Sequence, residues 1–186
     1  MPAKKQVTKG TILEAAFELV REKGMDALNM RDVAQKCNCS TQPIYLSFKG
    51  MDELKAEVAQ KAVEYFYKYI ENEIALNKYI EYKAVGMGYI RFAKEEKELF
   101  QFLFMERSQE KLNFSNDSFE KAVDIIMKNY SLTEQEAVRL QAEMWIFVHG
   151  FATMYATEYF DWDWETVSSM LTDAFFGFTS RIKKEK

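Results

Sequence analysis

The sequence contains few residues that interrupt a helix, with only two prolines and seven glycines among 186 residues. Proline lacks a backbone N–H donor and glycine loses the most backbone entropy, so both are unfavourable inside helices. Nearly half of the residues, 48%, are hydrophobic, and a chain of this length can bury a substantial core. We therefore predict an all-α protein with about nine helices.

Cysteine and histidine are also scarce, which limits the possible metal and catalytic sites. The two cysteines, Cys37 and Cys39, stand far from the only histidine, His149, and a structural zinc site needs more ligands than these. The chain shows no glycine-rich phosphate loop and no evident catalytic constellation. We expect no metal, no cofactor and no enzymatic activity. The cysteines are interpreted as small half-buried residues, with a redox-sensing pair as the alternative.

No segment of the sequence is long enough and apolar enough to cross a membrane. The longest uncharged stretch, Met144 to Thr157, has 14 residues, whereas a transmembrane helix needs about 20 apolar residues. The first residues, MPAKKQVTKG, are polar and basic and lack the apolar run of a secretory signal. We expect a soluble cytoplasmic protein without a membrane partner.

Acidic residues outnumber basic residues in the whole chain, 29 to 25, but not near its start. Residues 1–50 carry eight Lys or Arg against five Asp or Glu, a net charge of +3, and residues 51–186 carry 17 against 24, a net charge of −7. Alone, the first value describes a mildly basic solvated surface. Beside a DNA-binding motif it has the sign that phosphates require.

The segment from Asn29 to Leu54 has the pattern of a helix-turn-helix. In its first helix Asn29 is placed as the N-cap and Asp32 occupies the capping-box position. Four apolar residues share one face of this helix at i, i+3, i+4 and i+7: Met30, Val33, Ala34 and Cys37. Asn38 then tolerates the left-handed backbone of a tight turn.

The second helix of the motif is predicted to begin at the cap Ser40 and to run to about Phe48. Pro43 is acceptable as its third residue because first-turn amides have no acceptor within the helix. Ile44 and Phe48 point inward. The outward face, which is suited to reading base edges, holds Thr41, Gln42, Pro43, Leu46 and Ser47.

This segment resembles the DNA-binding region of tetracycline-repressor-like (TetR family) transcription regulators. The positions that match the family pattern are Gly24, Asn29, Val33, Ala34, Ser40, Ile44, Tyr45, Phe48 and Leu54. Ser47 departs from the aromatic or histidine residue that is frequent there, and Met51 stands where the family has a lysine. The resemblance implies that residues 1–50 form a three-helix helix-turn-helix domain.

The resemblance also implies which residues contact double-stranded DNA. Gln42 is expected to contact a base edge and Leu46 a thymine methyl group, whereas Tyr45 and Lys49 hold phosphates. Lys9 matches a basic position that the family uses near the DNA backbone. The full set of DNA-binding candidates is Lys9, Asn29, Thr41, Gln42, Pro43, Tyr45, Leu46, Ser47 and Lys49.

Residues 51–186 are predicted to form a helical ligand-binding and dimerisation domain. The first helix of the chain, in the other domain, is expected to start after Thr8 and to end at Gly24. In the second half of the chain, a capping box is expected at Thr133 and Glu136, and Asp163 is expected to cap the last helix. Residues 1–7 are expected to be a mobile basic arm and residues 108–117 a loop. The helices expected after residue 50 span 51–76, 79–95, 96–106, 117–130 and 134–160, followed by a last helix after residue 163.

The last two predicted helices favour a homodimer. The stretch from Met144 to Thr157 is apolar on nearly every face, so both sides of this helix must be covered, and a second subunit is the simplest cover for one side. The final helix carries one continuous apolar stripe. We expect an isologous four-helix interface that includes Phe151, Tyr155, Met170, Ala174 and Phe178.

An effector site is expected in the same domain. Trp145, His149 and Gly150 resemble a Trp-x-x-x-His-Gly signature of some ligand-binding domains in the TetR family, although a single histidine on an apolar helix is also common as a core residue. Candidate ligand-binding residues are Phe92, Phe104, Trp145, His149 and Met154. No Lys or Arg occurs between Leu140 and Ser180, so the expected effector is small and hydrophobic, or a hydrophobic cation.

The sequence thus favours a ligand-responsive DNA-binding transcriptional regulator, acting as a dimeric repressor on a palindromic operator. Alternatives are a helical scaffold or interaction protein, and a constitutive or redox-controlled DNA-binding regulator that uses the cysteines. The scaffold alternative leaves the polar outward face of the second motif helix without a purpose.

Overall fold

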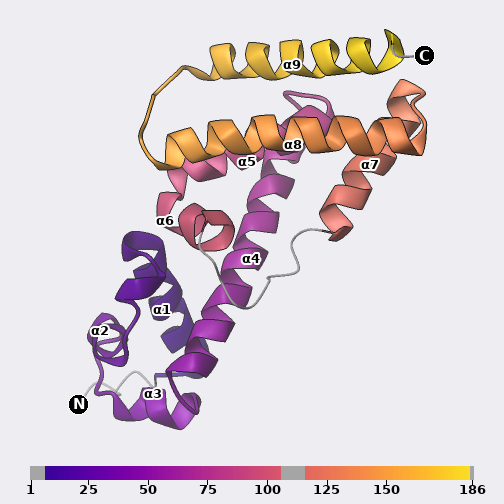
Figure 1. The fold of residues 1–186 in the computed structure, drawn as a ribbon. Coiled ribbons are helices and arrows are strands. Elements are labelled where there is room, and N and C mark those ends of the chain that lie inside the picture. Colours follow the sequence, from indigo (N-terminus) through magenta and orange to yellow (C-terminus); the bar gives the residue numbers. More distant parts are fainter. Residues whose placement is uncertain (1–6, 106–115, 185–186) are drawn as a thin grey trace. The chain divides into compact units, whose positions relative to one another are not determined.

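The computed structural model describes residues 7–105 and 116–184, and all regular secondary structure within these ranges is helical (Figure 1). The all-α prediction is confirmed, and no helix in the described part is long and apolar enough to cross a membrane. The elements in chain order are α1 (Lys9–Lys23), η1 (Met25–Ala27), α2 (Met30–Lys36), α3 (Gln42–Ser47), α4 (Met51–Ala75), α5 (Glu81–Glu95), α6 (Lys97–Phe100), η2 (Gln101–Met105), α7 (Asn116–Tyr130), α8 (Glu134–Ala156) and α9 (Trp164–Lys184).

The described residues form two compact units. Unit 1 comprises residues within Met1–Tyr67 and Glu96–Glu106, and unit 2 comprises residues within Lys68–Glu95 and Arg107–Lys186. Unit 1 therefore extends past residue 50 into α4 and also takes in a short segment from the middle of the chain. The boundary expected after residue 50 concerns which residues bind DNA, and it stays a prediction.

Helix α1 has the ends that its sequence predicts. The Oγ1 atom of Thr8 accepts a hydrogen bond from the Thr11 N–H (3.2 Å), and Gly24 adopts φ 80° while its N–H donates to the Val20 carbonyl (2.8 Å). A side chain at Gly24 would be strained at this φ, so glycine is required there. The buried face of α1 holds Ile12, Ala16, Phe17, Leu19 and Val20, and in unit 1 it packs against α2 and α3.

Helix α4 is one continuous helix of 25 residues, and the chain passes from unit 1 to unit 2 within it. Its buried stripe follows i, i+4 steps through Leu54, Val58, Ala62, Phe66 and Ile70. Such a stripe keeps one face of the helix in contact with a core over its whole length. The expected long helix of residues 51–76 is thus observed, ending at Ala75.

The segment expected to be a helix over residues 96–106 is helical from Lys97 to Met105, but it is not a single α-helix. Helix α6 ends at Phe100 and the chain continues as the π-helical turn η2. The wider turn brings Phe104 onto Phe100 (ring centroids 5.2 Å apart) and onto Phe66 of α4 (5.1 Å), while Phe102 and Leu103 stay buried. Packing of these large rings therefore replaces regular α-helical spacing.

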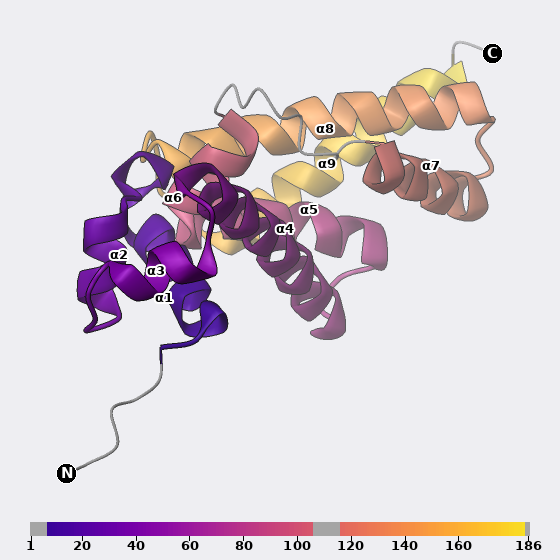
Figure 2. The same cartoon turned by 90° about the horizontal axis from the view of Figure 1, so that it is seen from below.

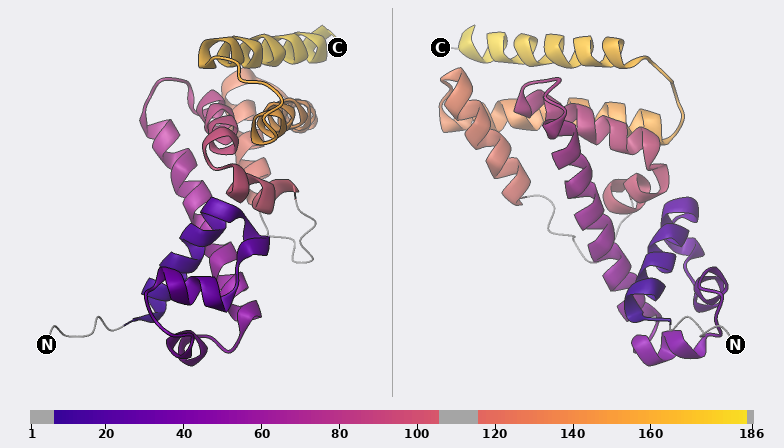
Figure 3. Two further views of the ribbon diagram at one scale, coloured as in Figure 1. Left: turned by 90° about the vertical axis from the view of Figure 1, so that its left-hand side faces the viewer. Right: turned by 180° about the vertical axis from the view of Figure 1, so that it is seen from behind.

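Helix α8 is the centre of unit 2 and packs against α5, α7 and α9. Its N-terminus is the predicted capping box, in which the Glu136 N–H donates to Thr133 Oγ1 (3.4 Å) and the Thr133 N–H to Glu136 Oε2 (2.8 Å). Asp163 caps α9 as expected, since its Oδ1 accepts from the Thr166 N–H (2.9 Å). Helices α8 and α9 pack against each other and run in opposite directions in Figure 1, and the other views show that they cross at an angle (Figures 2 and 3).

The predicted end of the penultimate helix near Phe160 is wrong, because α8 stops at Ala156. Glu158 adopts φ 56°, its N–H donates to the Tyr155 carbonyl (3.0 Å), and the Tyr159 N–H donates to the Met154 carbonyl (2.9 Å). This hydrogen-bond pattern is a Schellman motif with a glutamate in the left-handed position. The expected arm (residues 1–7) and loop (residues 108–117) lie mostly outside the described residues, and α7 begins at Asn116.

Candidate nucleic-acid interface

The helix-turn-helix of unit 1 begins with the predicted cap. The Asp32 N–H donates to Asn29 Oδ1 (3.0 Å), and Asn29 Nδ2 donates to Asp32 Oδ2 (2.9 Å) and to the Ala27 carbonyl (3.1 Å). The amide of Asn29 is therefore engaged at both ends in shaping the entry into α2. Asn38 takes the left-handed conformation expected of it, with φ 52°, in the turn between α2 and α3 (Figure 2).

The start of α3 differs from the prediction. Its N-cap residue is Thr41, with φ −70° and ψ −16°, and no side chain accepts a capping hydrogen bond there, so Ser40 is not the cap. Helix α3 begins at Gln42, which makes Pro43 its second residue. The missing N–H of Pro43 again costs nothing, because it falls in the first turn. A short helix of this kind depends on tertiary packing more than on capping.

Helix α3 is anchored by one face and exposed by the other. Ile44 is completely buried and Phe48, directly after the helix, is nearly so, whereas Leu46 is 81% exposed. A single exposed apolar side chain is ordinary on a protein surface, so the exposure of Leu46 shows only that this side chain is accessible to a partner. Of the other expected contact residues, Thr41, Gln42 and Tyr45 are exposed, and Pro43 and Ser47 are half-buried.

The two basic DNA-binding candidates, Lys9 and Lys49, have different surroundings. The Nζ atom of Lys9 lies 2.5 Å from Glu57, 3.8 Å from Glu53 and 4.9 Å from the Phe48 ring centroid, and the hydrogen bond to Glu57 raises the pKa of Lys9. Lys49 uses its backbone N–H to donate to Glu53 Oε2 (2.6 Å), and this residue is exposed. Lys9 is thus already paired with carboxylates, whereas Lys49 presents its charge to solvent.

The two cysteines flank the turn of the motif as half-buried free thiols. Cys37 Sγ lies 3.9 Å from the Thr11 carbonyl, and burial, followed by the neighbouring Cys39, raises the pKa of Cys37. A raised pKa lowers the fraction of the reactive thiolate. This environment favours the structural interpretation of the cysteines.

The candidate ligand residues are only partly brought together. In unit 2, the Trp145 and His149 rings are stacked with centroids 5.6 Å apart, and the Tyr89 hydroxyl lies 3.0 Å from His149 Nδ1. Trp145 is 43% exposed, and burial lowers the pKa of His149, which favours its neutral form. Sequence reasoning missed Tyr89, because it lies on α5 and only the α5–α8 packing reveals the contact.

The other three candidates do not join this cluster as expected. Phe92 is completely buried and its ring contacts Tyr69 (5.4 Å between centroids), so it contributes no free surface. Met154 is exposed on α8. Phe104 belongs to unit 1, where it packs on Phe66 and Phe100.

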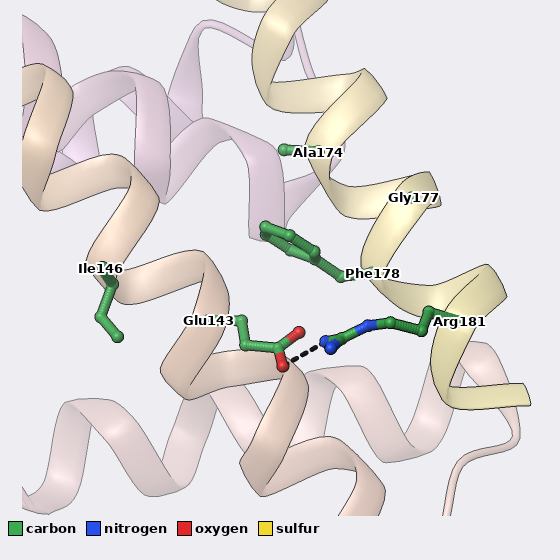
Figure 4. Close-up of a pocket in the computed structure, with 6 residues that line it drawn as sticks. All are labelled: Glu143, Ile146, Ala174, Gly177, Phe178 and Arg181. Carbon is green, nitrogen blue, oxygen red and sulfur yellow. Dashed lines mark hydrogen bonds and ion pairs between the residues drawn. The ribbon is translucent and has the colours of Figure 1, made fainter. Parts of the chain in front are cut away.

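An open groove of about 560 Å³ lies between α8 and α9 (Figure 4). Ile146 is 71% exposed at this groove, and Glu143 accepts from Arg181 across it and from Arg139 Nε (3.3 Å). The second carboxylate oxygen of Glu143 is buried without a hydrogen-bond partner among the described residues. The lining residues are Glu143, Ile146, Ala174, Gly177, Phe178 and Arg181.

The expected dimer-interface residues divide into two groups. Ala174 and Phe178 line the groove, and Met170 lies half-buried one turn earlier on α9. Phe151 and Tyr155 instead belong to the interior of unit 2, where Tyr155 donates to the Trp162 carbonyl (2.6 Å). These two buried residues have almost no surface left for a partner, so their assignment to the interface stays a prediction that their burial does not favour.

Two family models match the chain. "Bacterial regulatory proteins, tetR family" matches residues 12–58, which contain the helix-turn-helix described above. "Tetracyclin repressor-like, C-terminal domain" matches residues 82–175, which extend from α5 into α9. The second match alone covers half of the chain.

Two individual proteins are similar to this chain over nearly its full length. The uncharacterized HTH-type transcriptional regulator YobS of Bacillus subtilis (strain 168) is 18% identical over 166 residues, which are 88% of this chain and 87% of that protein. The crystal structure of a TetR variant from Acinetobacter baumannii AYE in complex with minocycline is similar with a TM-score of 0.54 and 19% identity, covering 96% of both chains. At this identity, the structural likeness establishes the fold.

Proposed function

The chain belongs to the TetR family of transcriptional regulators, and from this premise we propose that it is a homodimeric repressor released from a palindromic operator by a small effector. The observation that carries the proposal is the exposed face of α3, held outward by the buried Ile44 and Phe48. A short helix displayed in this way has the dimensions to enter a major groove.

In this proposal α3 reads the DNA sequence and its surroundings hold the phosphates. Gln42 contacts a base edge and Leu46 a thymine methyl, with Thr41, Pro43 and Ser47 beside them, and Tyr45 and Lys49 meet phosphates. Asn29 acts indirectly, since its amide caps α2. Lys9 reaches a phosphate only by leaving Glu57.

A second copy of the chain is the proposed occupant of the groove between α8 and α9. An apolar groove lined by the small residues Ala174 and Gly177 lets the helices of two subunits approach closely. Ile146, 71% exposed beside it, would be buried by such a partner. The proposed seam is therefore Ile146, Met170, Ala174, Gly177 and Phe178, in an isologous four-helix arrangement.

The proposed effector contacts Trp145 and His149. Trp145 offers an exposed aromatic surface, and the neutral His149 beside Tyr89 adds a hydrogen-bonding group, a combination suited to a hydrophobic or weakly cationic molecule. A panel of such compounds should quench Trp145 fluorescence. Trp145→Ala should reduce the effector response and leave operator affinity nearly unchanged.

Selection of bound duplexes from a random pool tests the function directly. We expect a palindromic motif, and binding that weakens steeply with salt because phosphate contacts release counterions. Enrichment of a motif without two-fold symmetry would contradict the dimeric mode of binding. Failure to retain any duplex would favour a helical interaction protein instead.

A further inference from the structure

Glu96 is the only buried charged residue among those that the structure describes in unit 1, and its side chain is 6% exposed. Its two oxygens accept from Arg21 of α1, with Nη2 at 2.5 Å and Nε at 2.6 Å, and the Tyr65 hydroxyl of α4 donates to Oε1 (2.8 Å). Such bidentate, charge-assisted hydrogen bonds are strong and geometrically specific. One carboxylate thus joins α1 and α4 to the chain just before α6.

The aromatic surroundings fix this network in place. The Arg21 guanidinium lies 5.4 Å from the Tyr65 ring centroid, and the Tyr65 ring meets Phe17 of α1 edge-on at 5.4 Å. Burial and Glu96 raise the pKa of Tyr65 to about 12, so its hydroxyl keeps its proton at neutral pH and acts as the donor.

The position of Glu96 in the chain gives the network its significance. Helix α5 of unit 2 ends at Glu95, and the chain enters unit 1 at the next residue, without an intervening loop. Within unit 2, Glu95 accepts a hydrogen bond from Tyr69 of α4. Tyr65 and Tyr69 lie one turn apart on the same helix, so two consecutive glutamates are each tied to α4 through a tyrosine.

We propose that the Arg21–Glu96–Tyr65 network is the contact through which the state of unit 2 controls DNA binding by unit 1, an inference that rests on the regulator function proposed above. A shift of the α5 C-terminus moves Glu96 directly, because the two residues are covalently adjacent. Removing one partner from a buried carboxylate strongly destabilises the fold around it. The network is therefore either intact or broken and does not deform gradually.

The network can be perturbed at two strengths, and the chain provides a matched control. Glu96→Gln removes the charge while keeping the shape of the side chain, and Tyr65→Phe removes a single hydrogen bond. The control is Glu14→Gln, because Glu14 of α1 also pairs with a residue of α4, Lys61 (2.6 Å). This ion pair lies on the surface and does not involve the segment that connects α5 to α6. Loss of an exposed ion pair has little effect on stability.

Hydrogen exchange with and without the operator duplex selected above tests the coupling without an identified effector, because linkage between two sites is reciprocal. In the parent protein, operator binding should slow exchange of the α5 amides by roughly 5- to 150-fold. Glu96→Gln should reduce this change to within about twofold, and Tyr65→Phe should reduce it partially. Glu14→Gln should leave it intact, and Arg21→Glu combined with Glu96→Arg should restore part of it.

The possible failures are distinguishable. If the parent binds no duplex, the regulator function fails and this inference fails with it. If the parent binds its operator but α5 exchange does not change, or if both network variants keep the full response, the coupling does not run through Glu96. Should Glu96→Gln fail to fold, Tyr65→Phe alone decides between these outcomes.

Discussion

Replacing Arg91 of α5 should strongly destabilise unit 2, because it leaves a buried carboxylate without a counter-charge. The Glu73 side chain is 4% exposed, and its Oε2 lies 3.1 Å from Arg91 Nε. Its Oε1 is buried and has no hydrogen-bond partner among the described residues. Gly88 of α5 packs so closely that a Cβ there would lie 3.1 Å from the Glu73 Cβ, so the carboxylate has little room to move towards water.

The two single variants should differ in cost. Arg91→Met should lower the free energy of unfolding by about 3–5 kcal/mol, the range for removing one partner of a buried pair. Glu73→Leu should cost less, roughly 1–2 kcal/mol, because Arg91 is 23% exposed and also lies 4.6 Å from the Trp164 ring centroid. The double variant should be close to the parent or up to about 4 kcal/mol more stable.

Urea denaturation followed by tryptophan fluorescence measures these effects in the right part of the molecule. All three tryptophans, Trp145, Trp162 and Trp164, lie in unit 2. The signal therefore reports the unfolding of the unit that contains the ion pair. A double variant as unstable as Arg91→Met would refute the reasoning, since it would mean that packing of the arginine stem and not its charge sets the cost.

Three further outcomes are expected. Gln42→Ala should weaken operator binding by about 1–3 kcal/mol and relax the preference at one base pair. Lys49→Ala should instead weaken binding to all duplexes alike and lower the salt slope by about one. If Gln42→Ala selects the same motif as the parent, Gln42 does not contact a base. Phe178→Glu should dissociate the dimer in sedimentation by placing an unpaired charge in the groove, while Phe176→Glu, at an exposed position two residues earlier on α9, should not; the reverse result would move the interface to another face. Burial lowers the pKa of His149, so the unfolded chain binds the extra proton first and the urea midpoint should fall as the pH drops below about 6.5; the same pH dependence in His149→Gln would assign the effect to other groups.

Features that depend on neighbouring residues were predictable from the sequence. The caps at Asn29, Thr133 and Asp163 and the left-handed Asn38 are all present where expected. Each rests on hydrogen bonds or backbone preferences within a few residues, and such local chemistry is encoded directly in residue order. The helix-turn-helix was therefore recognisable from Asn29 to Phe48 without knowledge of the rest of the fold.

The predicted helix ends and helix types differed from the structure where tertiary packing outweighed local sequence preference. Glu158 occupies a left-handed position usually held by glycine, so no residue type signalled the end of α8. The π-helical turn after Phe100 follows from the packing of Phe104 on α4, which spacing within the segment cannot reveal. The absence of a side-chain cap on α3 has the same origin, since buried Ile44 and Phe48 hold that helix.

The net charge of a segment does not show which of its charges are already paired, and Lys9 is an example. The net charge of +3 over residues 1–50 treats Lys9 as a free cation near phosphates, yet its amine is paired with Glu57 and lies near Glu53, which both follow residue 50. A phosphate contact by Lys9 must replace one ion pair with another, so its net contribution to DNA affinity is a difference between two similar terms. Glu57→Gln removes the nearer carboxylate without changing α3 and leaves Lys9 only the longer contact with Glu53 at 3.8 Å. It should therefore strengthen binding to all duplexes and steepen the salt dependence, as measured by anisotropy titrations at several salt concentrations. Unchanged affinity and slope would mean that the Lys9 amine makes no phosphate contact when DNA is bound.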